Sequence, residues 1–345
     1  MDDDNMNARS DGPPPETGKL TRELIIWAYR LLLDRDPESD KSIENAQAYG
    51  TVKKLVYAIV VSDEFGMRNP SLPIDRKYLP AASPALDVDA KCDAVTSAAF
   101  LARTARTWEI LGQERPHWSV LSSDQFSPER IAGSEADFYL SGGNDVAELF
   151  STLARAGVDP AGYRTAFEFG CGIGRVTPHL ARRFPRVIAC DVSASHSRLA
   201  AATINAAGIE NAEIVRATMP DFGMTQPFDV WYCRIVLQHN PPPLIRLILE
   251  RALKLLTPNG VAVFQVPTYA SRYRFSVAEY LATVEEPGSI EMHVLPQREI
   301  FAIAQAAGCV PLQVAEDDSI GVPGWISNVF TFRKSEKPVR NKSDR

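Results

Sequence analysis

A chain of 345 residues, 45% of them hydrophobic, is long enough to bury one substantial core and a smaller one. Its formal net charge of −6, without a basic patch interleaved with aromatic residues, argues against nucleic acid as a partner. No apolar run approaches the ~18 residues of a membrane span, and residues 1–5 do not resemble a signal peptide, so we expect a cytoplasmic protein without a membrane span.

The first predicted structure is a helical module at residues 20–69, which follows a polar, disordered tail at residues 1–19. A helix is expected over residues 20–33, with Thr21 as its N-cap. Its predicted apolar face consists of Leu24, Trp27, Ala28, Leu31 and Leu32. Further helices are expected up to Phe65.

The motifs of this module are Tyr-Arg-Leu-Leu-Leu-x-Arg-Asp-Pro, a later glycine and Ser-x-Glu-Phe. They resemble a small helical domain of unknown function that occurs beside bacterial glycosyltransferases, methyltransferases and surface-polysaccharide proteins. The alternative is a generic helical docking module. Both interpretations imply a protein partner for the module.

Residues 70–89 are rich in proline and lack periodicity, which predicts a linker before a larger domain at residues 90–333. The early part of that domain carries Trp108, Trp118, Phe138 and Tyr139. These side chains either cap the substrate side of the domain or belong to its core, and we expect the core because aromatic residues bury a large apolar area.

Residues 166–177 (AFEFGCGIGRVT) predict a strand, a glycine turn and a helix that starts near Arg175. Glycine is needed at the bend because the backbone turns sharply and a ligand must approach it closely. Residues 187–193 predict a second strand that ends in Asp191. This acid follows Gly170 at about the 20-residue separation expected of a carboxylate that binds ribose hydroxyls. The pattern predicts a nucleoside cofactor.

The glycine spacing indicates which cofactor. A dinucleotide site needs G-x-G-x-x-G/A, but the chain has Arg175 and Thr177 where that motif requires glycine or alanine. The observed E-x-G-x-G-x-G instead resembles motif I of the class I S-adenosylmethionine-dependent methyltransferases, and Asp191 with its neighbours resembles their second motif. The alternative is a tight turn in some other α/β protein.

This resemblance implies an α/β fold with a Rossmann-like, seven-stranded, mostly parallel sheet and helices on both faces. It implies S-adenosyl-L-methionine as cofactor, with Glu168 near the amino group and Asp191 at the ribose. The residues expected to bind the cofactor are Glu168, Gly170, Cys171, Gly172, Gly174, Arg175, Asp191, Val192 and Arg234.

The later elements are consistent with such a sheet. Strands are expected at residues 212–216, 228–233 and 261–266, a helix between the last two that ends at residues 258–260, a helix at residues 296–308, and a closing antiparallel pair near residues 310–314 and 327–332. A polar tail is expected at residues 334–345.

Histidine is the residue best suited to take a proton from a hydroxyl acceptor. His239 follows the fourth strand and His293 precedes the late helix, so both are expected at the carboxyl ends of the strands, where ligands of open α/β sheets bind. We predict them as catalytic residues, with a hydrogen-bonded structural histidine as the alternative for each. His179 and His196 are expected to be exposed on helices.

Residues 265–273 leave the fifth strand toward the same pocket, and we expect Tyr269, Arg272 and Tyr273 to contact the acceptor. The five cysteines form no C-x-x-C pair, so no metal site is expected.

The predicted function is methyl transfer to a hydroxyl of a sugar or surface-glycan precursor, as in polysaccharide biosynthesis, and only the helical module supports this acceptor. One alternative is a methyltransferase for a carboxylate or nitrogen of a small metabolite, for which both histidines are dispensable. Another is a non-catalytic cofactor-binding scaffold in a glycan-assembly complex.

Overall fold

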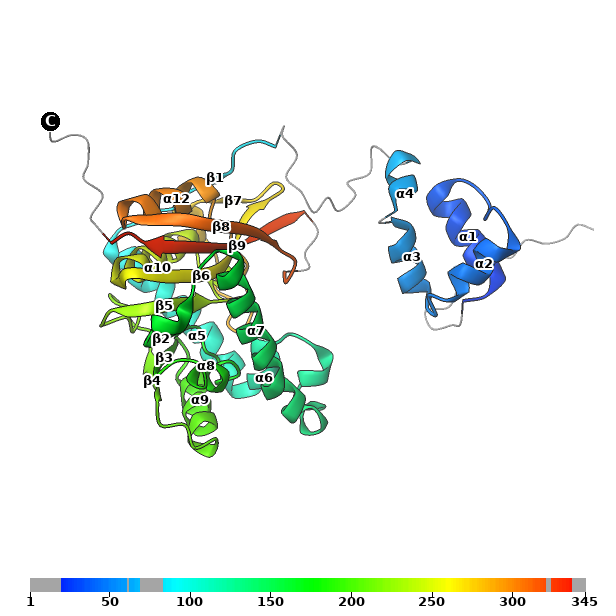
Figure 1. Ribbon diagram of the computed structural model, residues 1–345. Coiled ribbons are helices and arrows are strands. Elements are labelled where there is room, and N and C mark those ends of the chain that lie inside the picture. Colours follow the sequence, from blue (N-terminus) through cyan, green and yellow to red (C-terminus); the bar gives the residue numbers. More distant parts are fainter. Residues whose placement is uncertain (1–19, 61, 69–82, 321–323, 337–345) are drawn as a thin grey trace, which may run out of the picture. The chain divides into compact units, whose positions relative to one another are not determined.

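The computed structural model describes residues 20–60, 62–68, 83–320 and 324–336. The chain divides into two compact units, residues 1–76 and 77–345 (Figure 1). Each unit has its own hydrophobic core. The predicted tail at residues 1–19 lies outside the described residues, as do most of the predicted linker and of the polar C-terminal tail.

The first unit is helical, as predicted. Its helices are α1 (Arg22–Leu33), α2 (Asp40–Gln47), α3 (Val52–Val60) and α4 (Asp63–Arg68). Thr21 caps α1 as expected, because its hydroxyl oxygen accepts a hydrogen bond from the N–H of Leu24.

The predicted apolar face of α1 is wrong at two positions. Trp27 and Leu31 are 48% and 62% exposed, whereas Ile25, Ala28 and Leu33 are buried against the neighbouring helices. Both sets of residues have helical spacing, so periodicity alone does not separate them. The packing of α2 and α3 decides which set is buried.

The second unit contains the long chain segments on both sides of the glycine motif. Its helices are α5 (Ala94–Glu114), α6 (Pro116–Val120), α7 (Glu135–Arg155), α8 (Thr177–Ala181), α9 (Ala194–Ala206), α10 (Pro242–Leu255), α11 (Val277–Ala282) and α12 (Gln297–Ala306). Its strands are β1 (Asp87–Val88), β2 (Thr165–Phe169), β3 (Arg186–Asp191), β4 (Ala212–Arg216), β5 (Phe228–Cys233), β6 (Leu256–Ala270), β7 (Arg274–Phe275), β8 (Cys309–Asp317) and β9 (Trp325–Lys334).

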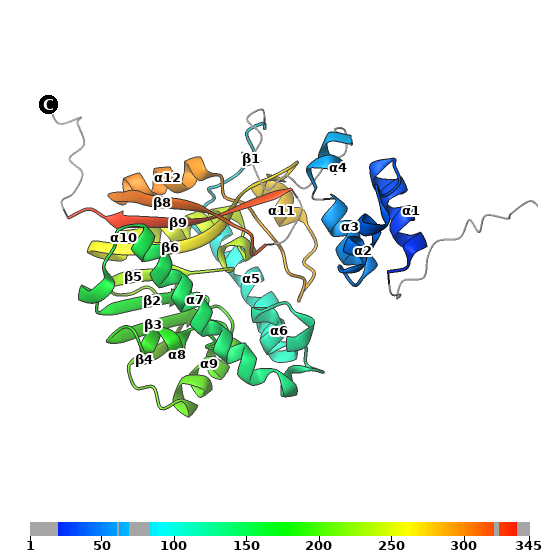
Figure 2. The same ribbon diagram turned by 45° about the vertical axis from the view of Figure 1, so that its right-hand side comes forward.

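Seven of these strands form one sheet in the order β4-β3-β2-β5-β6-β9-β8, which Figure 2 shows as a stack. The strands from β4 to β6 are parallel, and β9 runs antiparallel to both β6 and β8. This is the predicted Rossmann-like sheet with an antiparallel closing strand. The short strands β1 and β7 form a separate parallel pair.

Helices cover both faces of the sheet, as predicted. In β2, Ala166 faces a core shared with α7 and α8, whereas the next residue, Phe167, faces the core that contains α10 and α12. Alternation of this kind follows from the two-residue period of a strand. In the described part of the chain, none of the helices is both long and apolar enough to cross a bilayer.

Two predicted element limits are wrong. The helix expected near Arg175 begins at Thr177 and has only five residues, so a loop rather than a helix end follows the glycines. The helix expected to end at residues 258–260 ends at Leu255, and residues 258–260 lie inside β6, because Leu256 already pairs with Phe228 of β5. Asn259 takes a positive φ of 65° there, and the pairing shifts register nearby.

Candidate cofactor and active site

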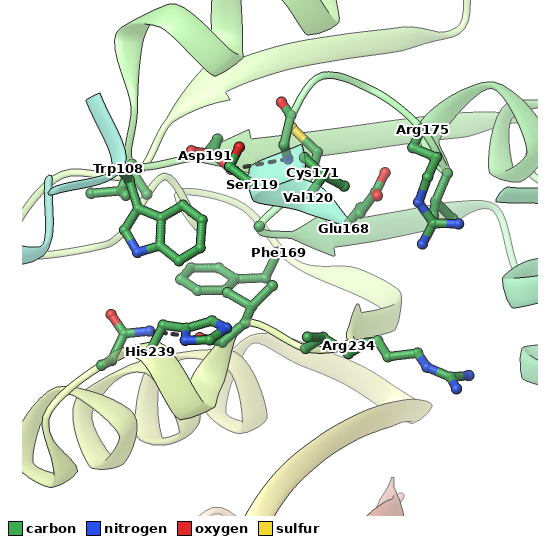
Figure 3. Close-up of a pocket in the computed structure, with 18 of the residues that line it drawn as sticks. Trp108, Ser119, Val120, Glu168, Phe169, Cys171, Arg175, Asp191, Arg234 and His239 are labelled. Carbon is green, nitrogen blue, oxygen red and sulfur yellow. Dashed lines mark hydrogen bonds between the residues drawn. The ribbon is translucent and has the colours of Figure 1, made fainter. Parts of the chain in front are cut away.

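A cleft opens at the carboxyl ends of β2, β3 and β5 (Figure 3). Its empty volume, including open solvent at the mouth, is about 990 Å³. The polar side chains Glu168, Arg175 and Arg234 lie toward one end, and Trp108 and His239 lie toward the other. The cleft therefore offers a charged end and an aromatic end.

The glycine loop forms one wall of this cleft. Gly170 and Gly172 have φ values of 79° and 54°, a region that favours glycine. A Cβ at Gly170 would lie 2.3 Å from a methyl carbon of Val236, and a Cβ at Gly172 would lie 2.5 Å from one of Val120. The loop is thus packed closely against the segment after β5 and against α6.

Asp191 lines the cleft at the tip of β3 and is 8% exposed. Its carboxylate accepts hydrogen bonds from the N–H of Gly172 at 2.9 Å and from the N–H of Ser193 at 2.8 Å. Val192, the next residue, also lines the cleft. The acid at this tip therefore also holds the glycine loop in place.

Glu168 is the acid at the charged end of the cleft and is 3% exposed. Burial raises the pKa of its carboxyl to about 7, although a hydrogen bond from the Thr177 hydroxyl (2.7 Å) and the charge of Arg175 act in the opposite direction. The group is thus close to half ionised at neutral pH. A cationic ligand group beside it would favour the carboxylate.

Three residues that line the cleft carry donor groups without a partner in the described part of the chain. Within the described residues, the Nε of Arg175, the hydroxyl of Tyr232 and the Nε of Arg234 are buried without a hydrogen-bond partner. Arg175 is held by Ser141 and Asp145, and Arg234 by Glu148 and Ser319. Buried donors are nearly always paired in proteins, so their arrangement fits a ligand with acceptor oxygens.

The residues therefore fit the amino-acid end of S-adenosyl-L-methionine, which carries an ammonium and a carboxylate. Glu168 provides a carboxylate for the first, and the three unpaired donors suit the second. The resemblance in the sequence did not indicate Tyr232. In the sequence this residue is simply part of a buried strand, and only the fold places it in the same cleft as the two arginines.

His239 lies at the end of the 3-10 turn Leu237–His239 and lines the aromatic end of the cleft. Its Nδ1 is 2.9 Å from the main-chain oxygen of Glu291, which can only accept, so Nδ1 carries the proton and Nε2 has a free lone pair. Removal from water, with a smaller effect of His293, lowers the pKa of His239 to about 4. The ring is thus neutral at physiological pH.

The structure does not bring the other predicted catalytic histidine into the cleft. His293 is 7% exposed and does not line the cleft; its ring nitrogens lie 3.0 Å from the hydroxyl of Tyr273 and 3.1 Å from the carboxylate of Glu291. It has the contacts of a hydrogen-bonded structural histidine.

The predicted acceptor contacts also lie elsewhere. Tyr269, Arg272 and Tyr273 are not among the residues that line the cleft. β6 continues to Ala270 and pairs with β9 up to Trp325, and this pairing carries the segment past the cleft. The apolar pattern of residues 261–266 underestimates the length of this strand, so the predicted contacts were placed too close to the cleft.

Two residues lie elsewhere than the sequence predicts: His196, which is close to two lining residues, and Trp108, which lines the cleft itself. His196, expected to be exposed, is 1% exposed; its Nε2 is 2.9 Å from the Ser119 hydroxyl, and its Nδ1 is 3.6 Å from Asp191. Trp108 lines the cleft, with ring centroids 6.2 Å from His196 and 5.1 Å from His239. No motif surrounds either residue, and both are placed by the packing of α5 against α9.

The cysteines are all free thiols, and Cys171, Cys190, Cys233 and Cys309 are buried. Burial raises the pKa of each of these four thiols, which keeps them protonated. Among the residues that the structure describes, no group of three or more His, Cys, Asp or Glu side chains is placed to hold a metal ion.

Residues 166–260 match the family model described as a methyltransferase domain. No curated protein matches the chain. Similar solved structures include magnesium protoporphyrin IX methyltransferase from Synechocystis with bound S-adenosylhomocysteine (14% identity, 68% of this chain, 100% of that chain, TM-score 0.47). Another is the N-methyltransferase NodS from Bradyrhizobium japonicum (16% identity, 66% of this chain, 98% of that chain, TM-score 0.42). A third is a putative sarcosine dimethylglycine methyltransferase from Galdieria sulphuraria (15% identity, 56% of this chain, 85% of that chain, TM-score 0.42).

Proposed function

We propose that this class I S-adenosylmethionine-dependent methyltransferase transfers its methyl group to a hydroxyl of a small molecule, with His239 as general base. When bound, S-adenosyl-L-methionine supplies an activated methyl group on a sulfonium. The observation that carries the proposal is the neutral His239 ring, whose Nδ1 is occupied by Glu291 and whose Nε2 can accept a proton. A hydroxyl must lose its proton to a base during methyl transfer, whereas an already neutral amine can attack the methyl group without one.

The cleft residues have separate roles in this proposal. Glu168 binds the ammonium of the cofactor, and Arg175, Tyr232 and Arg234 bind its carboxylate. Asp191 and Val192 border the ribose. The loop that contains Gly170, Cys171, Gly172 and Gly174 supports the part of the cofactor between its amino-acid end and its ribose. The support for these roles is the burial, charge and unpaired donors of the side chains.

We further propose that residues 20–69 and 90–333 are separate domains joined by a linker at residues 70–89. The two cores support this division. A sugar or surface-glycan precursor as acceptor is supported only by the motifs of the helical module. A cytoplasmic location is part of the same proposal.

A second candidate acceptor is an amine, because an acidic pocket adjoins the cleft. This pocket has an empty volume of about 870 Å³, including open solvent, and shares Tyr232 and Arg234 with the cleft. Its acidic lining residues are Glu148, Glu316, Asp317 and Asp318. Surplus negative charge of this kind favours a cationic acceptor.

The test is a methylation screen with the full chain and methyl-labelled S-adenosyl-L-methionine on matched panels of nucleotide sugars, phenols, amines and carboxylates. Our proposal predicts label in a hydroxyl-bearing compound and a rate lower by about 100-fold in His239→Asn. Label only in amines, with equal rates in the variant, would favour the second candidate. Cofactor binding without label in any panel would favour a non-catalytic scaffold.

A further inference from the structure

The main-chain oxygen that holds His239 belongs to a residue whose side chain is itself tightly held. The Glu291 carboxylate accepts hydrogen bonds from Arg103 (2.6 Å), from the Tyr280 hydroxyl (2.6 Å) and from His293 (3.1 Å). We call these four residues, Arg103, Tyr280, Glu291 and His293, the Glu291 cluster. Its members come from α5, from α11 and from the segment that precedes α12.

The cluster is connected to the segment of His239 by two hydrogen bonds. The Glu291 oxygen accepts from Nδ1 of His239 at 2.9 Å, and the N–H of His293 donates to the oxygen of Gln238 at 2.7 Å. Residues 291–293 therefore lie beside residues 238–239 in one register. Any displacement of Glu291 relative to residues 238–239 would also move the main-chain oxygen that accepts the hydrogen bond from His239.

The contacts of the Glu291 carboxylate are charge-assisted. Burial alone would raise the pKa of Glu291, but the hydrogen bonds from His293, Tyr280 and Arg103 lower it to about 2. The Arg103 guanidinium also lies 4.2 Å from the centre of the Tyr280 ring. His293 is fixed from its other side by Tyr273, at 3.0 Å.

We propose that Arg103, Glu291 and His293 are positioning residues for His239, and this inference rests on the proposed role of His239 as a base. By anchoring the main-chain oxygen of Glu291, they keep the proton of His239 on Nδ1 and the lone pair on Nε2. In this arrangement the predicted catalytic His293 acts through His239 and does not touch the acceptor. The titratable groups that influence His239 are His293 and, through its backbone, Glu291.

The chain contains a matched control for this cluster. Arg106, one turn after Arg103 on α5, donates a hydrogen bond to Glu285 at 2.9 Å and so connects the same two segments through residues other than the partners of His239. Glu285→Ala removes an ion pair between these segments, as Glu291→Ala does. Only Glu291→Ala removes the side-chain contacts that hold the main-chain oxygen to which His239 donates.

The first test needs no acceptor. In protein labelled with ¹⁵N-histidine, two-bond correlation spectra report which ring nitrogen carries the proton, and His239→Asn identifies the signal of His239. We expect the Nδ1–H form in the unaltered protein and in Glu285→Ala. In Glu291→Ala and Arg103→Met we expect a mixture of both forms and a pKa that moves up toward about 6.5. Unchanged spectra in both variants would overturn the inference.

Glu291→Gln keeps the size of the side chain and serves if Glu291→Ala does not fold. It replaces one of the two acceptor oxygens by an NH2 donor and removes the charge, so the three donors around Glu291 can no longer all be paired, and we expect a partial shift toward the mixed form. An Nδ1–H signal as sharp as in the unaltered protein would contradict the inference.

The second test uses a hydroxyl compound from the methylation screen. Glu291→Ala should lower kcat by about 10- to 100-fold while S-adenosyl-L-methionine affinity stays within about twofold. Glu285→Ala should leave both unchanged. If His239→Asn has no effect on kcat, the base itself fails, whereas a slow His239→Asn beside a fully active Glu291→Ala would refute only the positioning role.

Discussion

The carboxylate of Asp191 accepts a hydrogen bond from the main-chain N–H of Gly172, with 2.9 Å between oxygen and nitrogen. The acid that ends β3 and the glycine loop that follows β2 therefore hold each other in place. A carboxylate at Asp191 serves the fold as well as the proposed ribose contact. For this reason, experiments on the glycine loop separate stability from affinity only with a matched control.

Gly172→Ala and Gly157→Ala form such a pair. Both glycines have positive φ, 54° and 67°, and this backbone conformation alone should cost each substitution about 1–2 kcal/mol of stability. At Gly172 the close contact with Val120 adds to this cost. A Cβ at Gly172 would meet Val120 at 2.5 Å, whereas no heavy atom of the described chain lies within 4 Å of one at Gly157. Calorimetry should show lost cofactor affinity for Gly172→Ala alone. Equal affinities in both variants would show that the loop does not approach the cofactor.

Glu168 predicts a pH dependence of both stability and affinity. Its pKa is about 7 in the folded protein and ordinarily 4.5, so between these values the folded state binds more protons than the unfolded state. Stability should therefore fall as pH rises from about 4.5 to 7, by about 3 kcal/mol, and Glu168→Gln should remove this fall.

Cofactor affinity should change in the opposite direction. An ammonium favours ionised Glu168, so affinity should rise between pH 6 and pH 8 in the unaltered protein and stay level in Glu168→Gln. Calorimetry at both pH values checks this expectation. A parallel rise in the variant would assign the ammonium to another group.

Tyr232→Phe removes a buried hydroxyl that has no partner among the described residues. The unloaded protein should keep its stability or gain slightly, since an unsatisfied polar group is lost. Cofactor affinity should fall by about 5- to 10-fold if the hydroxyl binds the carboxylate, which corresponds to about 1 kcal/mol. Thr331→Val, which removes another unpaired buried hydroxyl away from the cleft, is the control. Equal affinities for the two variants would disprove the role of Tyr232.

His239 should give an acid limb in the pH profile of methyl transfer near pH 4. Because its pKa is lowered to about 4, the ring is neutral and able to accept a proton at all higher pH values, so the rate should be level from about pH 5.5 upward. Steady-state rates between pH 4 and pH 8 test this. A limb near the ordinary value of about 6.5 would mean that His239 is not the base, or is solvated when substrates bind.

The division into two domains predicts that residues 83–345 fold without the helical module. Their core contains no residue of the first unit, and the cleft is lined only by residues 101–248. The truncated protein should keep its cooperative thermal transition and bind S-adenosyl-L-methionine within about twofold of the full chain. Aggregation, or loss of binding in soluble material, would place the domain boundary elsewhere.

The sequence by itself determined the features that depend on near neighbours. The glycine turn needs φ values that few other residues adopt, β5 and β4 need short runs with strand character, and Thr21 needs only the N–H of Leu24. Each of these is set within a few residues. The order of the elements, and with it the Rossmann-like sheet, was therefore predictable.

Only the tertiary structure decided which distant side chains meet. The partners in the Glu291 cluster are up to 188 positions apart, and Tyr232 lines the same cleft as Arg175 only because distant segments pack together. The pairing of β6 with β9 took Tyr269 and Arg272 away from the cleft, and the packing of α5 brought Trp108 into it. A side chain's partner depends on the register and length of elements that lie far away in the sequence. Local spacing contains no record of either.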